Sequence, residues 1–423
     1  MRDRIILHVD INNFYASAAL LYNPDLKGKH FVVCGDPDKR HGVVLAKNES
    51  AKKLGVKTGE TLLEARRKVK DLFAVPPDFQ KYVFLSQKAV SLYKEYTPKV
   101  ESFGLDECWL DVTDTAHLFG GGVAVAESIR KRMKEEVGLT VSIGVSFTKT
   151  FAKLGSDMKK PDAITVISKE EFKKIVWNLP AQEMLFVGRA SVTKLQEMNI
   201  KTIGDIANSD VIKLNYAFGK NGGRLYQMAN GLDDEDVVDA ESSYVPESIS
   251  NGTTTETDLV NVRETQSVVF NLSEYIAFRL RKYGLSASGV SIWIRDKDLS
   301  TVSRQGLMAT SSNDAKVIAD FAMGLVKSIH RFGVDKPIRM VTVGTYELKK
   351  PVEERVQTSL FDEQEEKTGP INEKLDGLRK KYGYGILMRG VEINSPGINA
   401  KDLDGYIPFD RNNARKGDDP EGE

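Results

Sequence analysis

Short apolar runs bounded by breakers alternate with helical periodicity over the first 165 residues. The runs that are β-branched or aromatic predict strands at 5–9, 108–112 and 140–146. The longer amphipathic stretches predict helices at 14–20, 84–96, 122–137 and 148–158. A smaller α/β insertion is expected within 29–79, with strands near 31–34 and 42–46, a helix at 49–54, and an exit at Pro76-Pro77. The pattern predicts a mixed-sheet α/β domain with an insertion.

The second half of the chain changes character twice. Helical patterns dominate 171–237, and residues 238–249 contain Pro246 and lack apolar periodicity, which indicates a linker. Residues 250–350 alternate again, with strands expected at 253–255, 289–295 and 338–343 and helices at 264–283 and 313–332. Beyond residue 350 the chain is acidic and rich in breakers, so we expect a flexible tail with one short helix near 373–382.

Length and composition indicate a globular protein of several units. A chain of 423 residues is too long for one ordinary core and suggests about three or four compact units. No run of about 18 apolar residues occurs, so no membrane span is expected. The first residues lead directly into a strand, and Cys34 and Cys108 form neither a disulfide framework nor a metal cluster. A reducing cytoplasm fits these features.

The distribution of charge is more informative than its total. The formal net charge is zero, which argues weakly against nucleic acid as a partner. Residues 250–350, however, carry 14 Lys and Arg against 10 Asp and Glu, whereas residues 351–423 carry 11 against 16. A basic module is thus followed by an acidic tail, although a solvated surface explains this modest excess too.

Three acidic residues stand at the ends of two apolar runs: Asp10 after one, and Asp106 and Glu107 before the other. A carboxylate in a buried sheet loses its hydration and needs a compensating cation. Mg²⁺ takes oxygen ligands, and two such ions are the general solution for nucleotidyl transfer. A single Asp at a strand end is more often a turn former or a cap. The inference of a polymerase-type site therefore depends on all three together.

Three motifs in order resemble those of the Y-family, translesion-type DNA polymerases of the DinB/UmuC superfamily. They are VDINNFYAS at 9–17, GLDECWLD at 104–111, and SIGVS at 142–146 continuing through FAKLGSDMKKP at 151–161. A further apolar motif at 382–389 resembles the UvrX/UmuC-like branch of Gram-positive bacteria.

This resemblance implies an α+β multidomain protein with the fold of a right-hand polymerase. The expected parts are a mixed α/β palm at 1–11 and 79–168, small α/β fingers at 12–78, a helical thumb with a helix-hairpin-helix at 169–237, a linker at 238–249, an α/β little finger at 250–350, and a flexible acidic tail at 351–423.

The resemblance also assigns roles in the active site. Asp10, Asp106 and Glu107 would be catalytic and would hold two Mg²⁺ ions, with Mn²⁺ as a substitute and the Ile11 carbonyl as a further ligand. Tyr15 matches the steric gate that rejects a 2′-hydroxyl. The residues expected to contact the triphosphate are Phe14, Tyr15, Lys52 and Lys160.

The fingers depart from the family's pattern. A Tyr and an Arg that grip the triphosphate in much of the family are Glu49 and Lys52 here. Lysine keeps the charge but lacks the planar fork of arginine. We expect Lys52 to take the phosphate role, with Lys47 as another possibility and Glu49 turned away. Asn12 replaces an acid often found at that position, which should matter little.

The resemblance extends to DNA and partner contacts. Gly188 and Arg189 match the thumb hairpin, although Phe186 replaces its first glycine. Lys and Arg side chains of the little finger could follow the phosphate backbone, and a solvated face explains them almost as well: Arg279, Arg281, Lys282, Arg295, Lys297 and Arg304. In the tail, Gln357, Leu360 and Phe361 resemble the motif that binds the β sliding clamp.

The expected function is template-directed, error-prone DNA synthesis across damaged template, by a cytoplasmic monomer that acts on primer-template DNA and deoxyribonucleoside triphosphates. No segment suits a 3′→5′ exonuclease, so we expect no proofreading. One alternative is a UmuC-like adaptor that recruits repair factors to the clamp, but such a protein would be expected to lose its carboxylates. Another is a nucleotidyl cyclase, which would not need a thumb and little finger.

Overall fold

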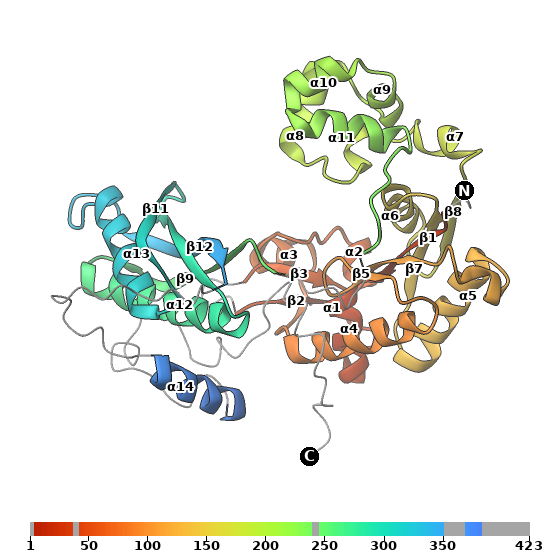
Figure 1. Cartoon of the computed structure of the whole chain (residues 1–423). Coiled ribbons are helices and arrows are strands. Elements are labelled where there is room, and N and C mark those ends of the chain that lie inside the picture. Colours follow the sequence, from red (N-terminus) through yellow and green to blue (C-terminus); the bar gives the residue numbers. More distant parts are fainter. Residues whose placement is uncertain (1–3, 37–41, 239–244, 351–368, 383–423) are drawn as a thin grey trace. The chain divides into compact units, whose positions relative to one another are not determined.

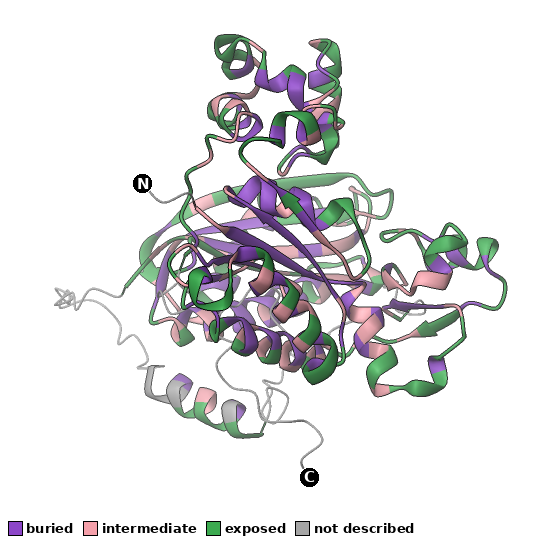
Figure 2. Ribbon diagram, turned by 90° about the vertical axis from the view of Figure 1, so that its right-hand side faces the viewer, coloured by how far each residue is buried: buried purple, intermediate pink, exposed green. Residues whose placement is uncertain are grey.

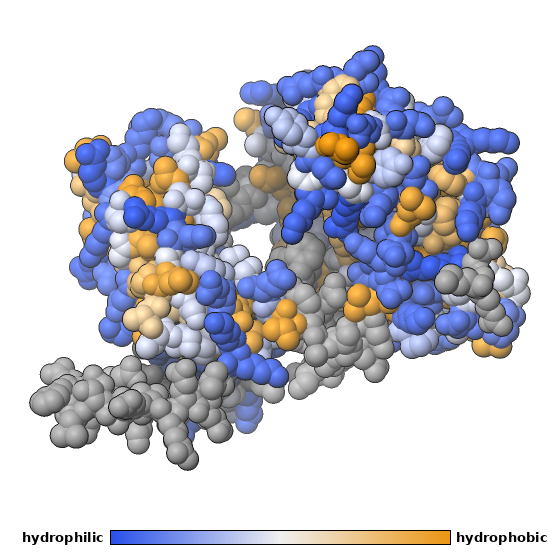
Figure 3. All heavy atoms as spheres, turned by 45° about the horizontal axis from the view of Figure 1, so that its top comes forward, coloured by the Kyte–Doolittle hydropathy of each residue, from blue (hydrophilic) through white to orange (hydrophobic). Residues whose placement is uncertain are grey.

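The computed structural model describes residues 4–36, 42–238, 245–350 and 369–382. Residues 4–34 and 44–238 belong to a first compact unit, and residues 245–350 and 369–382 to a second (Figure 1). The expected clamp-binding residues lie outside the described part of the chain. None of the described helices is long and apolar enough to cross a membrane. On the face drawn in Figure 3, hydrophilic residues prevail and hydrophobic ones form small separate groups.

A five-stranded sheet in the order β5-β6-β1-β7-β8 is the centre of the first unit. Its strands are β1 (Ile6–Ile11), β5 (Val100–Ser102), β6 (Glu107–Asp111), β7 (Val141–Ser146) and β8 (Ile164–Ile167). Strand β1 pairs antiparallel with both β6 and β7, whereas β7 and β8 are parallel. All six residues of β1 are buried, as the purple strands of Figure 2 show.

Helices cover both faces of this sheet. Alternate residues of β1, including Leu7 and Val9, pack into one hydrophobic core with α1 (Phe14–Tyr22), α4 (Phe79–Lys94) and α5 (Gly122–Arg132). Helix α5 continues directly into a π-helix at Met133–Val137. The other alternate residues, among them Ile6, face α6 (Lys149–Met158). The period of two along a strand therefore divides β1 between a purely apolar face and the face toward α6.

Helix α6 approaches the sheet closely because a glycine lies beneath it. A Cβ atom built at Gly144 would lie 1.9 Å from the Ala152 carbonyl oxygen and 2.6 Å from the Ser156 nitrogen. The Gly144 Cα itself lies 3.2 Å from a Cβ built at Gly155 of α6. Only glycine fits at position 144, and this contact places α6 beside the middle of β1, because Gly144 pairs with His8.

A smaller three-stranded sheet in the order β3-β2-β4 lies between β1 and α4 in the sequence. Its elements are β2 (Phe31–Cys34), β3 (Val44–Lys47), α2 (Glu49–Lys53), α3 (Leu62–Lys68) and β4 (Phe73–Val75). Helix α3 and strand β4 were not predicted. Asn48 accepts a hydrogen bond from the Ala51 amide at the start of α2, and Thr61 with Glu64 forms a capping box at the start of α3.

A helical part follows β8, and its hydrophobic core also includes Phe151 and Leu154 of α6 and Ile167 of β8. It consists of α7 (Phe172–Val176), α8 (Arg189–Glu197), α9 (Ile203–Ala207), α10 (Val211–Phe218) and α11 (Lys220–Ala229).

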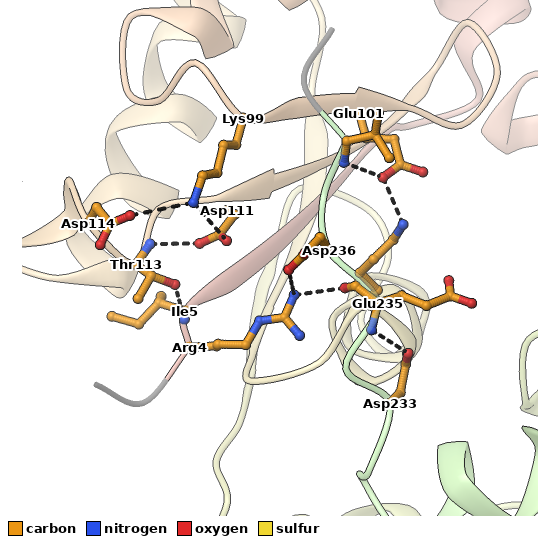
Figure 4. Close-up of polar contacts among 12 residues, drawn as sticks. Arg4, Ile5, Lys99, Glu101, Asp111, Thr113, Asp114, Asp233, Glu235 and Asp236 are labelled. Carbon is orange, nitrogen blue, oxygen red and sulfur yellow. Dashed lines mark hydrogen bonds and ion pairs between the residues drawn. The ribbon is translucent and has the colours of Figure 1, made fainter. Parts of the chain in front are cut away.

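Polar contacts fix the chain after these helices to the rest of the first unit (Figure 4). Arg4 donates a hydrogen bond of 2.7 Å to the Glu235 carbonyl. Glu101 of β5 accepts hydrogen bonds from the Val238 amide at 2.9 Å and from Lys149 at 2.7 Å. Residues 235–238, the last described before the second unit, are therefore anchored by side chains of the sheet.

The second unit is a four-stranded antiparallel sheet in the order β11-β10-β12-β9 with helices packed against it. Its elements are β9 (Ser248–Leu259), α12 (Val262–Lys282), β10 (Ser286–Asp296), β11 (Thr301–Ser312), α13 (Ala315–Ile329), β12 (Ile338–Lys349) and α14 (Gly369–Tyr382). Strand β11 was not predicted, because it is an edge strand with only Met308 buried and lacks an apolar run. The helix expected near 373–382 is present and begins earlier.

Candidate active site

The register of β1 and β6 brings two of the three predicted carboxylates together. Asp10 is directly opposite Glu107 in the antiparallel ladder, so their side chains share one face of the sheet. His8 is opposite Trp109 on the same face, two residues away. Asp106 precedes Glu107, and its carbonyl accepts a hydrogen bond of 2.9 Å from the Ile11 amide. Asp10 and Glu107, which are 97 positions apart in the sequence, therefore meet at one end of two strands.

Two lysines of the α6 segment contact this carboxylate pair. The Lys153 ammonium lies 2.7 Å from Glu107 and 3.7 Å from Asp10. The Lys160 ammonium lies 2.7 Å from Asp10. Asp157 accepts from both lysines, at 3.4 Å and 2.8 Å. The two lysines therefore lie between carboxylates of the sheet and the carboxylate of Asp157.

Burial makes two of the carboxyl groups hard to ionise. Burial raises the pKa of Asp10 to about 7, and the charge of Lys160 only partly opposes this effect. Burial, with the negative charge of Glu107, raises the pKa of Asp106 to about 6. Additional positive charge at this place would stabilise both carboxylates.

Glu107 has the opposite shift. Burial tends to raise its pKa, but the contacts with His8 and Lys153 outweigh burial and bring the pKa to about 2. The His8 ring lies between Glu107 at 3.3 Å and the Ser156 hydroxyl at 2.8 Å. Burial lowers the pKa of His8 to about 4, so the ring is neutral near pH 7.

The donor set suits a hard divalent cation, although the conformation is not yet that of a metal site. Three carboxyl groups offer oxygen ligands, and the raised pKa values of Asp10 and Asp106 indicate a deficit of positive charge. In the part of the chain that the structure describes, no three His, Cys, Asp or Glu residues are arranged to hold one ion together. Lys153 and Lys160 supply the positive charge here, and a divalent ion would have to displace them.

Tyr15 lies at the start of α1, one turn from the end of β1. Its ring is half-buried and stacks on Tyr82 of α4, with centroids 4.4 Å apart. Phe14 and Phe79 pack against the same pair of rings. The neighbouring helix therefore fixes the orientation of Tyr15 and allows it to act as a rigid wall.

Glu49, which was expected to turn away from the triphosphate, contacts the turn that follows β1. Its carboxylate accepts a hydrogen bond of 3.2 Å from Asn13, in the turn between β1 and α1. Lys52 lies 3.8 Å from Glu49, and Lys47 donates to Thr58 at 2.8 Å. Asn13 has φ +48°, a left-handed conformation that asparagine tolerates. Its hydrogen bond to Glu49 connects α2 of the fingers directly to this turn.

Asn12, expected to matter little, is buried and joins three segments. It donates to the Ser142 hydroxyl at 2.8 Å and accepts from the Asp162 amide at 2.9 Å. The second bond holds the chain just after Lys160 against the end of β1. The amide group makes both contacts at once, since its nitrogen donates and its oxygen accepts.

The predicted thumb hairpin keeps its backbone shape in spite of its substituted glycine. Phe186 has φ +68°, in the left-handed region that favours glycine. Its ring is stacked under the Arg224 guanidinium, 4.7 Å from the ring centroid. Gly188 then forms the N-cap of α8, and its carbonyl accepts from the Val192 amide.

Three of the six cations expected to contact DNA in the second unit do not share one face. Arg295 is on the open face of β10 with Trp293, because both alternate with buried Ile292 and Ile294. Arg304 of β11 is opposite Ile292 and so is on the face toward the helices, although it is exposed. Lys297 lies in the exposed turn between the strands. Arg281 is not part of this surface, because it pairs with Asp376.

Sequence reasoning missed Lys153, Asp157 and His8. Lys153 lies in a helix whose other central residues, 150–152 and 154–156, are buried. A charged residue within such a stretch is a usable signal, since buried lysines are nearly always paired. His8 offered no comparable signal, because its role depends on the register with β6.

Comparison with known proteins gives a consistent result. Residues 9–157 match the impB/mucB/samB family, and residues 246–360 match the C-terminal domain of that family. Residues 185–233 match the thumb domain of DNA polymerase-iota. The matched segments coincide with the sheet and helices described above.

Curated relatives and a solved structure extend the match over almost the whole chain. DNA polymerase IV of Acetivibrio thermocellus is 42% identical over 398 residues, covering 94% of this chain and 99% of the relative. DNA polymerase IV 1 of Halalkalibacterium halodurans is 35% identical, covering 93% and 94%. A solved Y-family DNA polymerase chimera superposes with a TM-score of 0.74 at 23% identity, covering 82% of this chain and 100% of the chimera. The right-hand polymerase fold is therefore confirmed.

Proposed function

The chain belongs to the impB/mucB/samB family, the Y-family DNA polymerases, and on this premise we propose that it extends primer 3′ ends across damaged template with low fidelity and without proofreading. The observation that carries the proposal is the cross-strand pair of Asp10 and Glu107 with Asp106 beside it. Buried carboxylates with raised pKa values are typical of sites that accept a cation or a proton.

In this proposal Asp10, Asp106 and Glu107 hold Mg²⁺ or Mn²⁺, with the Ile11 carbonyl as a further oxygen ligand. When bound, two such ions stabilise the charge on the attacking and leaving oxygens of nucleotidyl transfer. Lys160 and Lys153 exchange their carboxylate contacts for other anions, and the triphosphate is the natural anion for Lys160. Phe14, Tyr15 and Lys52 complete the triphosphate pocket.

Primer extension with Mg²⁺ tests the proposal. A variant with Asp106→Ala and Glu107→Ala should lose at least about 10³-fold in rate, because the stabilisation of transition-state charge disappears. Asp111→Asn is the matched control: Asp111 ends the same strand but pairs with Lys99 at 3.7 Å. Equal rates for the double variant and the wild type would favour the adaptor function instead.

Tyr15 is proposed as the steric gate because its ring is held by Tyr82 next to the carboxylate turn. Tyr15→Ala should raise ribonucleotide incorporation at least about tenfold, since the lost ring area no longer clashes with a 2′-hydroxyl. Tyr22→Ala, at the other end of α1, is the control. Unchanged sugar selectivity of Tyr15→Ala would remove this assignment.

Gln357, Leu360 and Phe361 are proposed to dock into an apolar pocket of the β sliding clamp, and their support is the sequence motif alone. Replacing all three with Ala should abolish stimulation by the clamp and leave unassisted extension intact. Loss of unassisted extension would instead indicate a structural role for this segment.

A further inference from the structure

Helix α14, in the acidic C-terminal segment, contacts the second unit through charged side chains. Arg281 of α12 forms a two-bond pair with Asp376, at 2.5 Å and 2.8 Å. Arg379 donates to Glu274 of α12 at 3.1 Å. Asn372 donates to Asp314, the N-cap residue of α13, at 3.3 Å. Three residues of one short helix therefore reach both helices of the domain.

The second of these ion pairs is almost completely buried. The side chains of Glu274 and Arg379 are each 1% exposed, and those of Arg281 and Asp376 are 13% and 18% exposed. A charged side chain is almost never buried to this extent unless it is paired. Polar residues accompany Glu274 along α12, since Ser267 and Asn271 are also buried. The face of α12 that carries these residues is therefore covered by polar groups of the protein rather than by water.

The order of the charges selects one orientation of α14. On α12 the acid precedes the base, as Glu274 and Arg281, two helical turns apart. On α14 the acid again precedes the base, as Asp376 and Arg379. Antiparallel helices bring each acid to a base. Parallel helices would bring Glu274 near Asp376 and Arg281 near Arg379, and such like-charge contacts disfavour that arrangement.

The described side chains of α14 lie outside the hydrophobic core of the domain. The cluster between the sheet and the inner faces of α12 and α13 includes no described side chain of α14. Leu378 and Tyr382 are 42% and 56% exposed. Among the side chains that the structure describes, those of α14 that are buried are polar, namely Asn372 and Arg379.

We propose that the surface formed by α12 and α13 is an intramolecular docking site for α14, and that the reciprocal ion pairs make α14 a releasable latch. The latch does not rest on the proposed function.

Hydrogen exchange of the full-length chain tests the latch directly. Glu274→Arg and Arg379→Glu, each alone, place like charges together in a buried position and should reduce protection of the α14 amides at least tenfold. The double exchange restores an opposite pair and should recover most of the protection. Arg263→Glu, an exposed position on α12, is the matched control and should leave α14 protected.

A second pair of variants and a separate clamp-binding measurement complete the test. If a Glu274 variant fails to fold, the more exposed pair is exchanged instead, as Arg281→Asp with Asp376→Arg. Protection of α14 that is unchanged in the single variants, or a double exchange that remains unprotected in a folded protein, would overturn the latch. Failure of the wild type to bind the clamp would remove the clamp proposal and leave the exchange result intact.

Discussion

The two large sheets of the molecule differ in how far their polar side chains are buried. In the first unit, helices cover both faces, and all six residues of β1 are buried, including Asp10. In the second unit, α12 and α13 pack on one face of the sheet, and the edge strand β11 has only Met308 buried. A two-sided cover changes the protonation of the carboxyl groups beneath it, whereas an open sheet presents side chains that keep their hydration. Buried carboxyl groups with altered pKa values are suited to catalysis, whereas hydrated side chains on an open sheet are suited to contact with a large charged ligand.

The largest expected effect concerns the close approach of α6 to the first sheet. Gly144→Ala should lower the free energy of unfolding by about 3 kcal/mol, because the added methyl group overlaps backbone atoms of α6. Polymerase activity should fall as well, since α6 and the lysine that it carries would be displaced from the end of the sheet where the three carboxyl groups lie. Urea unfolding measures the first effect and primer extension the second.

Gly324→Ala in α13 is the control for that variant, because nothing lies within 4 Å of its built Cβ. It should be neutral or stabilise by about 0.5 kcal/mol. Equal stability of the two variants would show that α6 is not held closely against the first sheet.

The next effect concerns the buried carboxylates. The pKa of Asp10 is raised from 3.8 to about 7 by burial, so the folded state binds this proton more tightly than the unfolded chain does. The lowered pKa of His8 raises stability up to about pH 6.5, but the stabilising contribution of Asp10 should be lost as the pH rises from about 5 to 7.5. Asp10→Asn removes this loss and should be about 1–3 kcal/mol more stable than the wild type at pH 7.5, with a smaller difference at pH 5.

Urea unfolding at both pH values measures this difference, and the window above pH 5 avoids the titration of Glu107, whose pKa is about 2. Asp111→Asn is the control from the same sheet and should not gain stability at pH 7.5. A destabilised Asp10→Asn protein at pH 7.5 would contradict the view that burial dominates at this position.

The smallest effect compares the two faces of the second sheet. Arg295→Ala, on the open face, should weaken binding of primer-template DNA about threefold and reduce the dependence of log K on log salt by about 1, the change expected for one lost phosphate contact. Arg304→Ala, on the opposite face, should change neither as much. Fluorescence anisotropy at several salt concentrations measures both. Equal effects would mean that DNA contacts the edge of β11 rather than the open face.

The local elements of the site could be predicted because their signals are local. Strands β1, β6 and β7 are apolar runs, and the acids at their ends stand in recognisable motifs. Strand β11 and helix α3 were missed because partly exposed elements carry little hydrophobic pattern. The identification of the family likewise followed from three short motifs, and the family match and the curated relatives confirm it.

The amino-acid sequence by itself determined that β1, β6 and β7 are strands, in what order the acids stand along the chain, and which family the chain belongs to. Only the tertiary structure decided that Asp10 is opposite Glu107, that Lys153 reaches both, that Arg295 and Arg304 point to different faces, and that α14 pairs with α12. The physical reason is register: a shift of one residue between two strands reverses the face of every side chain, and the contacts that fix the register lie far apart in the sequence.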